Sequence, residues 1–189
     1  AKSAGASFGR AYSLNVAPGG SLSVAFWMKS PDGWDQYSYD VLHAVNDDDS
    51  SGGVHAAHVR VGLRPGKFMV ALGQSAAAIA EFPLTDITDD KRWHHVAAVV
   101  RPNATSGDTR RYDVAMYVDG NRVHASQRST DHAALFGTHV ADCAATLTPW
   151  RCAESTVIGK PSGGGNHNAV LIDDFVMWHR ALTTTTCVS

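Results

Sequence analysis

Long apolar runs and clusters of basic residues are both missing from this sequence. No stretch approaches the roughly 20 apolar residues that a membrane-spanning helix needs, so we expect no direct membrane insertion. Lysine and arginine number 16 against 18 acidic residues, a formal net charge of -2, and they form no run. Without a sustained positive field, nucleic acid is not expected as a partner.

Cysteine is scarce, with only Cys143, Cys152 and Cys187. The short separation favours a disulfide between Cys143 and Cys152, but Cys187 could take either partner, and free thiols are the alternative. Asn103 begins a sequon for N-glycosylation inside the polar segment 102–109. A glycoprotein with paired cysteines belongs in an oxidising compartment, so we expect an extracellular or cell-surface location.

Helical periodicity is also rare. The best helix candidate, the alanine-rich Ser75–Ala80, is too short to stand alone in water, and an irregular edge is the alternative. β-rich runs are present instead, and in the first of them every second residue is large and apolar. These runs are Leu22–Lys29, Tyr39–Val45, Val54–Leu63, Lys67–Leu72, Trp93–Arg101, Arg111–Val118, Arg122–Ser126, Thr156–Gly159 and Val170–His179.

Turn signals separate these runs, and Asp119-Gly120 is the sharpest of them. It lies between two β-rich runs, and a type I′ turn needs positive φ at both of its central residues, which Asp-Gly tolerates. We therefore predict a β-hairpin centred on this pair. The number and spacing of the strands are typical of a β-sandwich.

Four stretches along the chain together form a more specific pattern. They are Ser21–Lys29, then Trp93–Val99, then Met116–Gly120, and finally Val157–Gly159 with Leu171–Trp178 and Ala181–Thr183. In this order they resemble the laminin-G-like, pentraxin-like branch of the concanavalin A-type jelly rolls. The resemblance implies an all-β, antiparallel two-sheet sandwich. We expect one LamG-like domain over residues 1–189, excised from a larger extracellular protein.

Paired carboxylates for glycoside hydrolysis are missing as well. The jelly-roll hydrolases carry two Glu residues on one strand, whereas this chain has only Glu81 and Glu154, far apart. Asp173 and Asp174 are adjacent, and strand alternation would send them to opposite faces. We therefore expect no enzyme, and a degenerate hydrolase is the alternative from another class.

Calcium is the one cofactor that the sequence suggests. Asp47, Asp48 and Asp49 lie in a loop-like segment followed by glycines, and Ca²⁺ prefers several oxygens gathered by such a loop. The pentraxin resemblance implies calcium at a similar place, but the acidic cluster that completes the pentraxin site is absent. Asp173 is a second candidate ligand, although a structural role there is favoured. A solvated acidic turn is the alternative for the Asp47–Asp49 loop.

Ten histidines invite comparison with zinc sites, but their spacing opposes this reading. Neighbours such as His94 and His95 face opposite ways on a strand, and no helix aligns two imidazoles. Trp27, Trp93 and Trp178 lie in β-rich runs and are expected in the core or on a sheet face.

Aromatic residues in loops offer better candidates for ligand binding. Trp34 and Tyr37 share a turn-rich segment with polar neighbours, which suits sugar or peptide recognition. Asn166 and Asn168 follow a glycine-rich loop and are further candidates. We therefore predict a non-catalytic, lectin-like recognition module that binds a glycan or a protein at the cell surface, with calcium assistance and a role in adhesion. A protein-interaction module without glycan affinity is the alternative.

Overall fold

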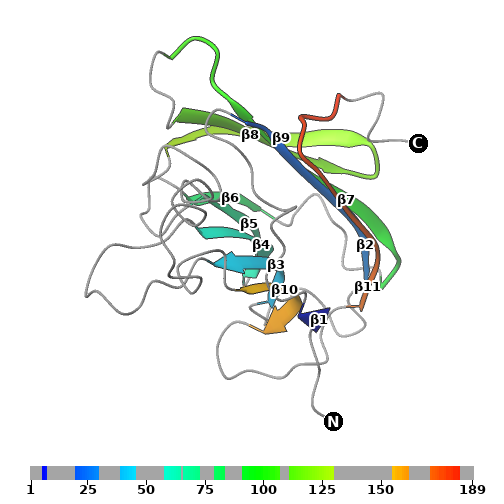
Figure 1. Cartoon of the computed structure of the whole chain (residues 1–189). Helices are drawn as coiled ribbons and strands as arrows, with labels where there is room; N and C mark the ends of the chain where they lie inside the picture. The colour runs from blue at the N-terminus through cyan, green and yellow to red at the C-terminus, as the bar shows by residue number, and fades with distance from the viewer. Residues whose placement is uncertain are drawn as a thin grey trace, which may run out of the picture.

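The computed structural model describes residues 6–7, 20–29, 39–45, 58–64, 66–72, 79–83, 91–106, 111–129, 155–161 and 171–183. The regular structure in these segments consists of β-strands, which form two antiparallel sheets that face one another (Figure 1). The all-β sandwich predicted from the sequence is thereby confirmed. The described residues contain no helix that is long and apolar enough to cross a membrane.

One sheet has six strands and the other has five. The six-stranded sheet runs in the order β1 (Ala6–Ser7), β10 (Ser155–Pro161), β3 (Tyr39–Val45), β4 (His58–Arg64), β5 (Lys67–Ala71) and β6 (Ile79–Pro83). The five-stranded sheet runs in the order β11 (Leu171–Trp178), β2 (Leu22–Lys29), β7 (His94–Pro102), β8 (Arg111–Val118) and β9 (Asn121–Ser129). Strands far apart in sequence are therefore neighbours, as β11 and β2 are.

The main hydrophobic core fills the space between the sheets. The alternation expected in β2 places Leu22, Val24, Phe26 and Met28 in this core, all nearly inaccessible to solvent. Phe26 also stacks on Phe68 of the opposite sheet, with ring centroids 6.3 Å apart. Because each fully buried apolar side chain contributes about 1.5–3 kcal/mol, this inner face fixes which face of each strand points outward.

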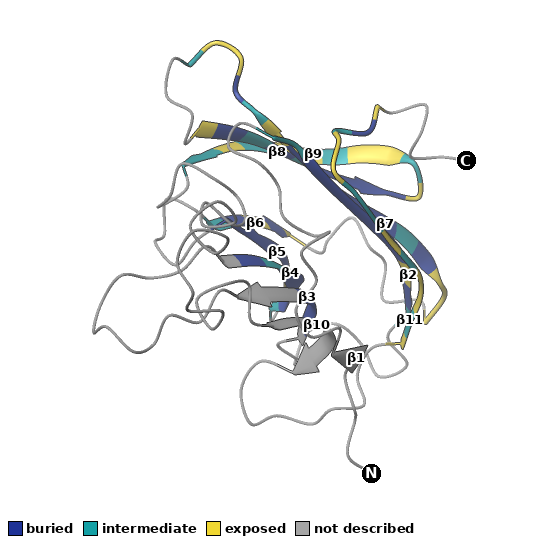
Figure 2. Cartoon of the chain, in the orientation of Figure 1, coloured by how far each residue is buried: buried dark blue, intermediate teal, exposed yellow. Residues whose placement is uncertain are grey.

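The outer face of the five-stranded sheet carries a second, smaller apolar cluster. Ala25, Ala97, Val99 and Tyr117 are buried there beneath Leu182. The segment 179–183, which follows β11, crosses this face and covers the central strands, whose residues are largely buried in Figure 2. Only part of the outer face is therefore open to a ligand.

A buried serine holds that crossing segment in place. The side chain of Ser23 is fully buried on the outer side of β2. Its Oγ donates to the carbonyl oxygen of Arg180 at 2.7 Å and accepts from the N–H of Leu182 at 3.0 Å. Since both groups belong to the segment after β11, one side chain joins residues more than 150 positions apart.

Two local predictions can be compared directly with the structure. Asp119 and Gly120 have φ angles of 48° and 79°, so the hairpin predicted at this pair is confirmed. Of the segment Ser75–Ala80, only the last two residues can be compared with the helix considered for it, because residues 75–78 lie outside the described residues. Ile79 and Ala80 belong to strand β6, which pairs with β5, so the end of the segment is strand and not helix.

Candidate functional site

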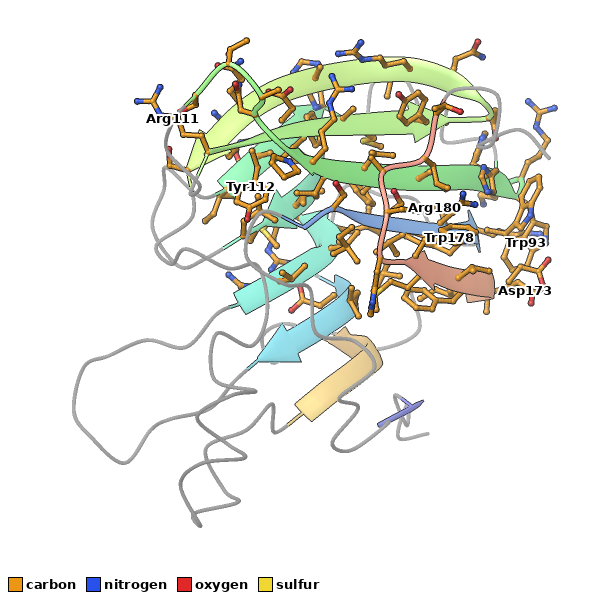
Figure 3. The ribbon with its side chains drawn as sticks, turned by 45° about the horizontal axis from the view of Figure 1, so that its top comes forward. Trp93, Arg111, Tyr112, Asp173, Trp178 and Arg180 are labelled. Carbon is orange, nitrogen blue, oxygen red and sulfur yellow. The ribbon has the colours of Figure 1, made fainter. Side chains whose placement is uncertain are left out.

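Exposed tryptophans gather at one end of the outer face of the five-stranded sheet. Trp27 of β2 is 39% exposed and Trp93, which immediately precedes β7, is 41% exposed. Leu171 and Val176 of β11 are 49% and 42% exposed. We call these residues, together with His95, the tryptophan patch. Trp93 and Asp173 lie at this end of the sheet in Figure 3.

Strand register explains why these side chains meet. Trp27 is directly opposite His95 of β7 on one side and Asp173 of β11 on the other. Directly opposite residues have Cβ atoms about 4.5–5.5 Å apart and share a face. The Trp27 and His95 rings make an edge contact with centroids 5.4 Å apart and an interplanar angle of 61°. Lys29 stands opposite Leu171, so charged groups border the aromatic surface.

A hydrogen-bonded carboxylate anchors this end of β7 to the β8–β9 hairpin. One oxygen of Asp119 lies 2.8 Å from Nδ1 of His94, and the other accepts from the backbone N–H of His95 at 2.9 Å. The backbone N–H of Asp119 donates in turn to the carbonyl oxygen of His95. Burial lowers the pKa of the His95 imidazole below 6.5, although the negative charge of Asp119 acts in the opposite direction. His95 is therefore mostly neutral at pH 7.

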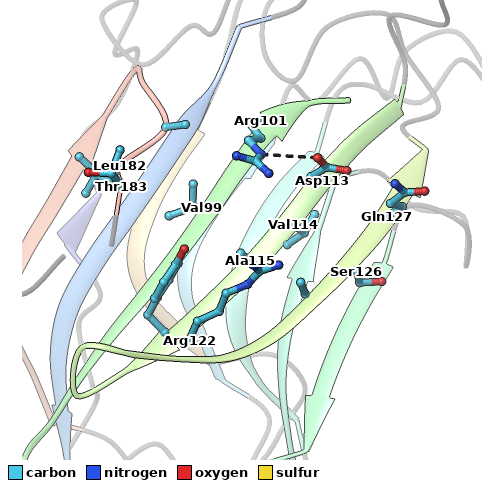
Figure 4. Close-up of a pocket in the computed structure, with 13 residues that line it drawn as sticks. Val99, Arg101, Asp113, Val114, Ala115, Arg122, Ser126, Gln127, Leu182 and Thr183 are labelled. Atoms are coloured by element: carbon cyan, nitrogen blue, oxygen red, sulfur yellow. Dashed lines mark ion pairs between the residues drawn. The ribbon is translucent and has the colours of Figure 1, made fainter. Parts of the chain in front are cut away.

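An open hollow of about 550 Å³ lies farther along the same outer face. Its size falls within the roughly 300–1,000 Å³ typical of small-molecule sites. Strands β7, β8 and β9 form its floor, and the segment 179–183 borders it (Figure 4). The lining residues are Val99, Arg101, Asp113, Val114, Ala115, Tyr117, Arg122, Ala125, Ser126, Gln127, Ala181, Leu182 and Thr183.

Asp113 is the only acidic residue among the described residues that line this hollow, and its neighbours hold it in position. One of its oxygens accepts a hydrogen bond from Nδ2 of Asn103 at 3.0 Å, and the other lies 3.5 Å from Nε of Arg101. The Arg101 side chain is 61% exposed. An ion pair that is so exposed is a weak source of stability, so this pair orients the arginine more than it stabilises the fold.

The predicted glycosylation residue Asn103 proves to be an organiser of its loop. It is only 8% exposed, and its Oδ1 accepts from the N–H groups of Thr105 and Ser106 and from the hydroxyl of Thr105. Its Nδ2, the atom that would carry a glycan, already donates to Asp113. A glycan would leave only one N–H on that nitrogen, and glycosylation of Asn103 stays a prediction.

Asp173 is the one predicted metal ligand that the structure describes. Its Oδ1 accepts a hydrogen bond from the backbone N–H of Asp174 at 2.9 Å, inside a β-bulge where Asp174 has φ 47°. Both side chains are exposed, so the bulge breaks the strict alternation expected for this pair. This hydrogen bond fits the structural role favoured for Asp173. Across the described segments, no three histidine, cysteine or acidic side chains are grouped as a metal would require.

The other predicted site residues lie outside the described residues. They comprise the loop aromatics, the asparagines after the glycine-rich loop, the acidic loop and the cysteines. By number they are Trp34, Tyr37, Asn166, Asn168, Asp47, Asp48, Asp49, Cys143, Cys152 and Cys187. Their proposed roles stay predictions.

Most residues of the tryptophan patch and of the hollow were not among the site residues predicted from the sequence. Trp27 and Trp93 were expected in the core or on a sheet face, and the sheet-face alternative is confirmed. A signal for Trp27 was available, because it shares its face of β2 with Ser23 and Lys29 rather than with the apolar core residues. No local signal marks the hollow, since its walls come from three strands and the segment 179–183.

Comparisons with known proteins agree with this architecture. Residues 3–186 match the model of a laminin G family, described as the concanavalin A-like lectin/glucanases superfamily. No curated protein matches the sequence. Among solved structures, the binding domain of botulinum neurotoxin serotype D aligns with a TM-score of 0.62 and 14% identity. The serotype G binding domain aligns with a TM-score of 0.60 and 11% identity.

A third similar structure is the binding domain of Paraclostridial mosquitocidal protein 1, with a TM-score of 0.56 and 14% identity over 95% of this chain and 38% of that one. Both neurotoxin matches cover 100% of this chain and 40% of the other chain. This chain thus spans about two fifths of the length of these structures. At such low identity they show a shared fold, whereas the family match extends over nearly the whole sequence. The chain belongs to the laminin G family of the concanavalin A-like lectin/glucanase superfamily.

Proposed function

We propose that this chain is a non-catalytic recognition module that binds a glycan on the outer face of its five-stranded sheet. The observation that carries the proposal is the exposure of Trp27 and Trp93 at one end of that face. Indole rings have a large apolar surface and usually bury most of it. Two tryptophans that remain about two fifths exposed on a sheet are therefore candidates for a binding surface.

The chemistry around the tryptophans suits a saccharide. The apolar C–H faces of sugar rings pack against flat aromatic surfaces, while hydroxyl groups need polar partners at the edges. Lys29 and Asp173 flank Trp27 along the sheet and supply a donor and an acceptor, and His95 offers a ring nitrogen. Orientation comes from a few such polar groups around an apolar surface. The tryptophan patch therefore combines both parts of a sugar site.

A protein partner is the second candidate, and Leu171 and Val176 favour it. These side chains are more exposed than aliphatic residues in a monomer usually are, and they extend the patch without polar atoms. The charged residues beside Trp27 favour the glycan. If the protein bound no glycan but captured a defined protein, a protein partner would become the better proposal.

Family membership supports a binding role, because its superfamily includes lectins, although it includes glucanases too. One similar structure belongs to botulinum neurotoxin type C, whose cell entry depends on interaction with two ganglioside molecules. That statement concerns the neurotoxin, of which this chain covers 34%. It makes a glycolipid headgroup a sensible inclusion among the glycans to be tested.

A hydrolase would need two carboxylates on either side of a bond. The single glutamate in the described segments, Glu81, forms an exposed ion pair with Lys67 at 2.7 Å on the six-stranded sheet. Asp173 accepts from the backbone N–H of Asp174, and Asp119 is engaged by His94 and by the backbone N–H of His95, so both carboxylates have structural partners. The non-catalytic role is therefore the better proposal, and turnover of a polysaccharide by the purified chain would overturn it.

An extracellular location and a calcium ion that stabilises the fold belong to the same proposal. The Asn103 sequon and the pair Cys143 and Cys152 support the location. The Asp47–Asp49 loop supports calcium binding. Mass spectrometry of the natural protein under non-reducing conditions tests the disulfide and the glycan. A peptide with free thiols and an unmodified Asn103 would count against the location.

A glycan array tests the function. Wild-type protein should bind a defined subset of glycans, and Trp27→Ala should lose most of that binding while its circular dichroism stays unchanged. Trp27→Phe is the matched control, because it keeps an aromatic ring and should retain part of the affinity. An array without any bound glycan, or a Trp27→Ala variant that binds like wild type, would contradict the proposal.

A further inference from the structure

The hollow beyond the segment 179–183 differs in character from the tryptophan patch. Its floor is mainly apolar, with Val99, Ala115 and Ala125 beside the ring of Tyr117. The described residues contribute two guanidinium groups and one carboxylate to it, a net positive charge from this part of the chain. Both features lie on the same face of the five-stranded sheet, but the chemistry of the hollow points to a different part of a ligand.

The two arginines have donors that the described residues leave available. Arg122 takes part in no hydrogen bond or ion pair with the described part of the chain, and Arg101 uses only Nε, toward Asp113 at 3.5 Å. A guanidinium group has five N–H donors in a planar fork that matches carboxylate and sulfate oxygens. Both side chains reach the hollow, Arg101 from β7 and Arg122 from β9, the two strands on either side of β8 (Figure 4).

Asp113 does not cancel this positive charge. The carboxylate is already engaged by Nδ2 of Asn103 at 3.0 Å and by Arg101, and it stands beside one of the two arginines only. Its effect is to hold the Arg101 side chain over the sheet, which lowers the entropy lost when a ligand binds. Asp113 and Asn103 are therefore positioning residues for Arg101.

From these observations we infer that the hollow binds the acidic group of a glycan, a carboxylate or a sulfate ester, through Arg101 and Arg122. The inference rests on the proposed glycan-binding function and specifies its ligand as an acidic saccharide. The accessible apolar part of the floor, Ala115 and Ala125, contacts the sugar ring, and Gln127 stands at one side for its hydroxyl groups. A neutral sugar would make no charge-assisted hydrogen bond with either guanidinium group, so the site prefers charged sugars.

The test uses three small probes that differ only in the group at carbon 6 of the sugar, which is a carboxylate, a sulfate ester or a neutral hydroxyl. Methyl β-D-glucuronide, methyl β-D-glucoside 6-sulfate and neutral methyl β-D-glucoside are titrated separately into the isotope-labelled full chain, and amide chemical shifts are recorded. We expect at least one charged probe to shift amides around Ala115, Tyr117 and Ser126, with binding at least tenfold tighter than that of the neutral glucoside. Comparison of the two charged probes tells a carboxylate from a sulfate. Added salt should weaken the binding, because exposed charges are screened.

Variants separate this inference from the proposed function. Arg101→Gln with Arg122→Gln should abolish the charged-probe shifts, while Lys67→Gln on the other sheet removes a positive charge and should leave them unchanged. Equal binding of charged and neutral probes, or no effect of the double variant, would overturn the inference. If the inference fails but glycan binding on the array still depends on Trp27, the proposed function holds without it. If the array shows no bound glycan but the charged probes shift amides in the hollow, the hollow is the binding site and the tryptophan patch is not.

Discussion

His95 is a residue of the candidate binding face whose pKa is shifted by its surroundings. Burial lowers its pKa below 6.5, so the folded state takes up the proton less readily than the unfolded chain does. As pH falls below 6.5, the unfolded state binds more protons and the free energy of unfolding decreases. The stability associated with a neutral His95 is therefore present above that pH and lost below it.

The His95→Gln variant tests this expectation, because glutamine keeps a polar side chain but does not titrate. Urea unfolding at pH values above and below 6.5 should show a larger loss of stability in wild type than in the variant. The variant keeps all the other histidines, so the difference between the two pH profiles is due to His95. Parallel pH profiles for the two would show that His95 does not contribute.

Ser23 offers a second prediction at the residue scale. Ser23→Ala removes both hydrogen bonds to the segment 179–183 and leaves the buried N–H of Leu182 without its partner. An unsatisfied buried group costs roughly 1–3 kcal/mol, which is the expected loss in unfolding free energy. Ser129→Ala at the end of β9 is the control and should change stability by less than about 0.5 kcal/mol. A Ser23→Ala protein as stable as this control would show that the segment is not held by the serine.

At the scale of elements, the β8–β9 hairpin can be tested through Asp119. Asp119→Ala removes two accepted hydrogen bonds and places alanine at a positive φ of 48°. The two effects together should cost about 2–4 kcal/mol. Asp119→Asn keeps one carbonyl oxygen and a residue that tolerates this conformation, so its loss should be clearly smaller in thermal unfolding. Equal losses for the two variants would mean that the turn conformation and the hydrogen bonds are unimportant.

The crossing segment 179–183 can be tested through Leu182, which covers the outer apolar cluster. Leu182→Ala should reduce the unfolding free energy by about 2 kcal/mol, because it uncovers Val99 and Tyr117. Leu171→Ala, the same substitution at a leucine of β11 that is 49% exposed, should stay within about 0.5 kcal/mol of wild type in the same denaturant titration. If Leu182→Ala were as mild, the segment would not cover the sheet in solution.

Elements with local signals could be predicted from the sequence, and those that depend on distant contacts could not. Strand β2 has its own alternation, and Asp119-Gly120 has the chemistry of its turn, so both were found. Strand β6 includes the last two residues of the segment considered for a helix, and it is defined by its pairing with β5. The position of Leu182 depends on Ser23, more than 150 residues away, and no local pattern encodes it. The site residues were missed for this reason: the face is assembled by register between distant strands.

At the scale of the whole molecule, we expect glycan binding to be independent of metal binding. The tryptophan patch borders on a single candidate metal ligand, Asp173, and one of its oxygens accepts from Asp174. We therefore expect glycan affinity to be the same with excess Ca²⁺ and with chelator, even if calcium at the Asp47–Asp49 loop raises the unfolding midpoint. Loss of glycan binding in chelator would move the site to that loop.

The most direct test of the central claim compares two tryptophans in one binding experiment. Calorimetric titration with the strongest array glycan should show that Trp27→Ala loses at least tenfold in affinity, while Trp34→Ala in the loop candidate binds like wild type. That result would place recognition on the outer face of the five-stranded sheet. Loss of affinity in Trp34→Ala with wild-type binding by Trp27→Ala would contradict the account and return the site to the loops.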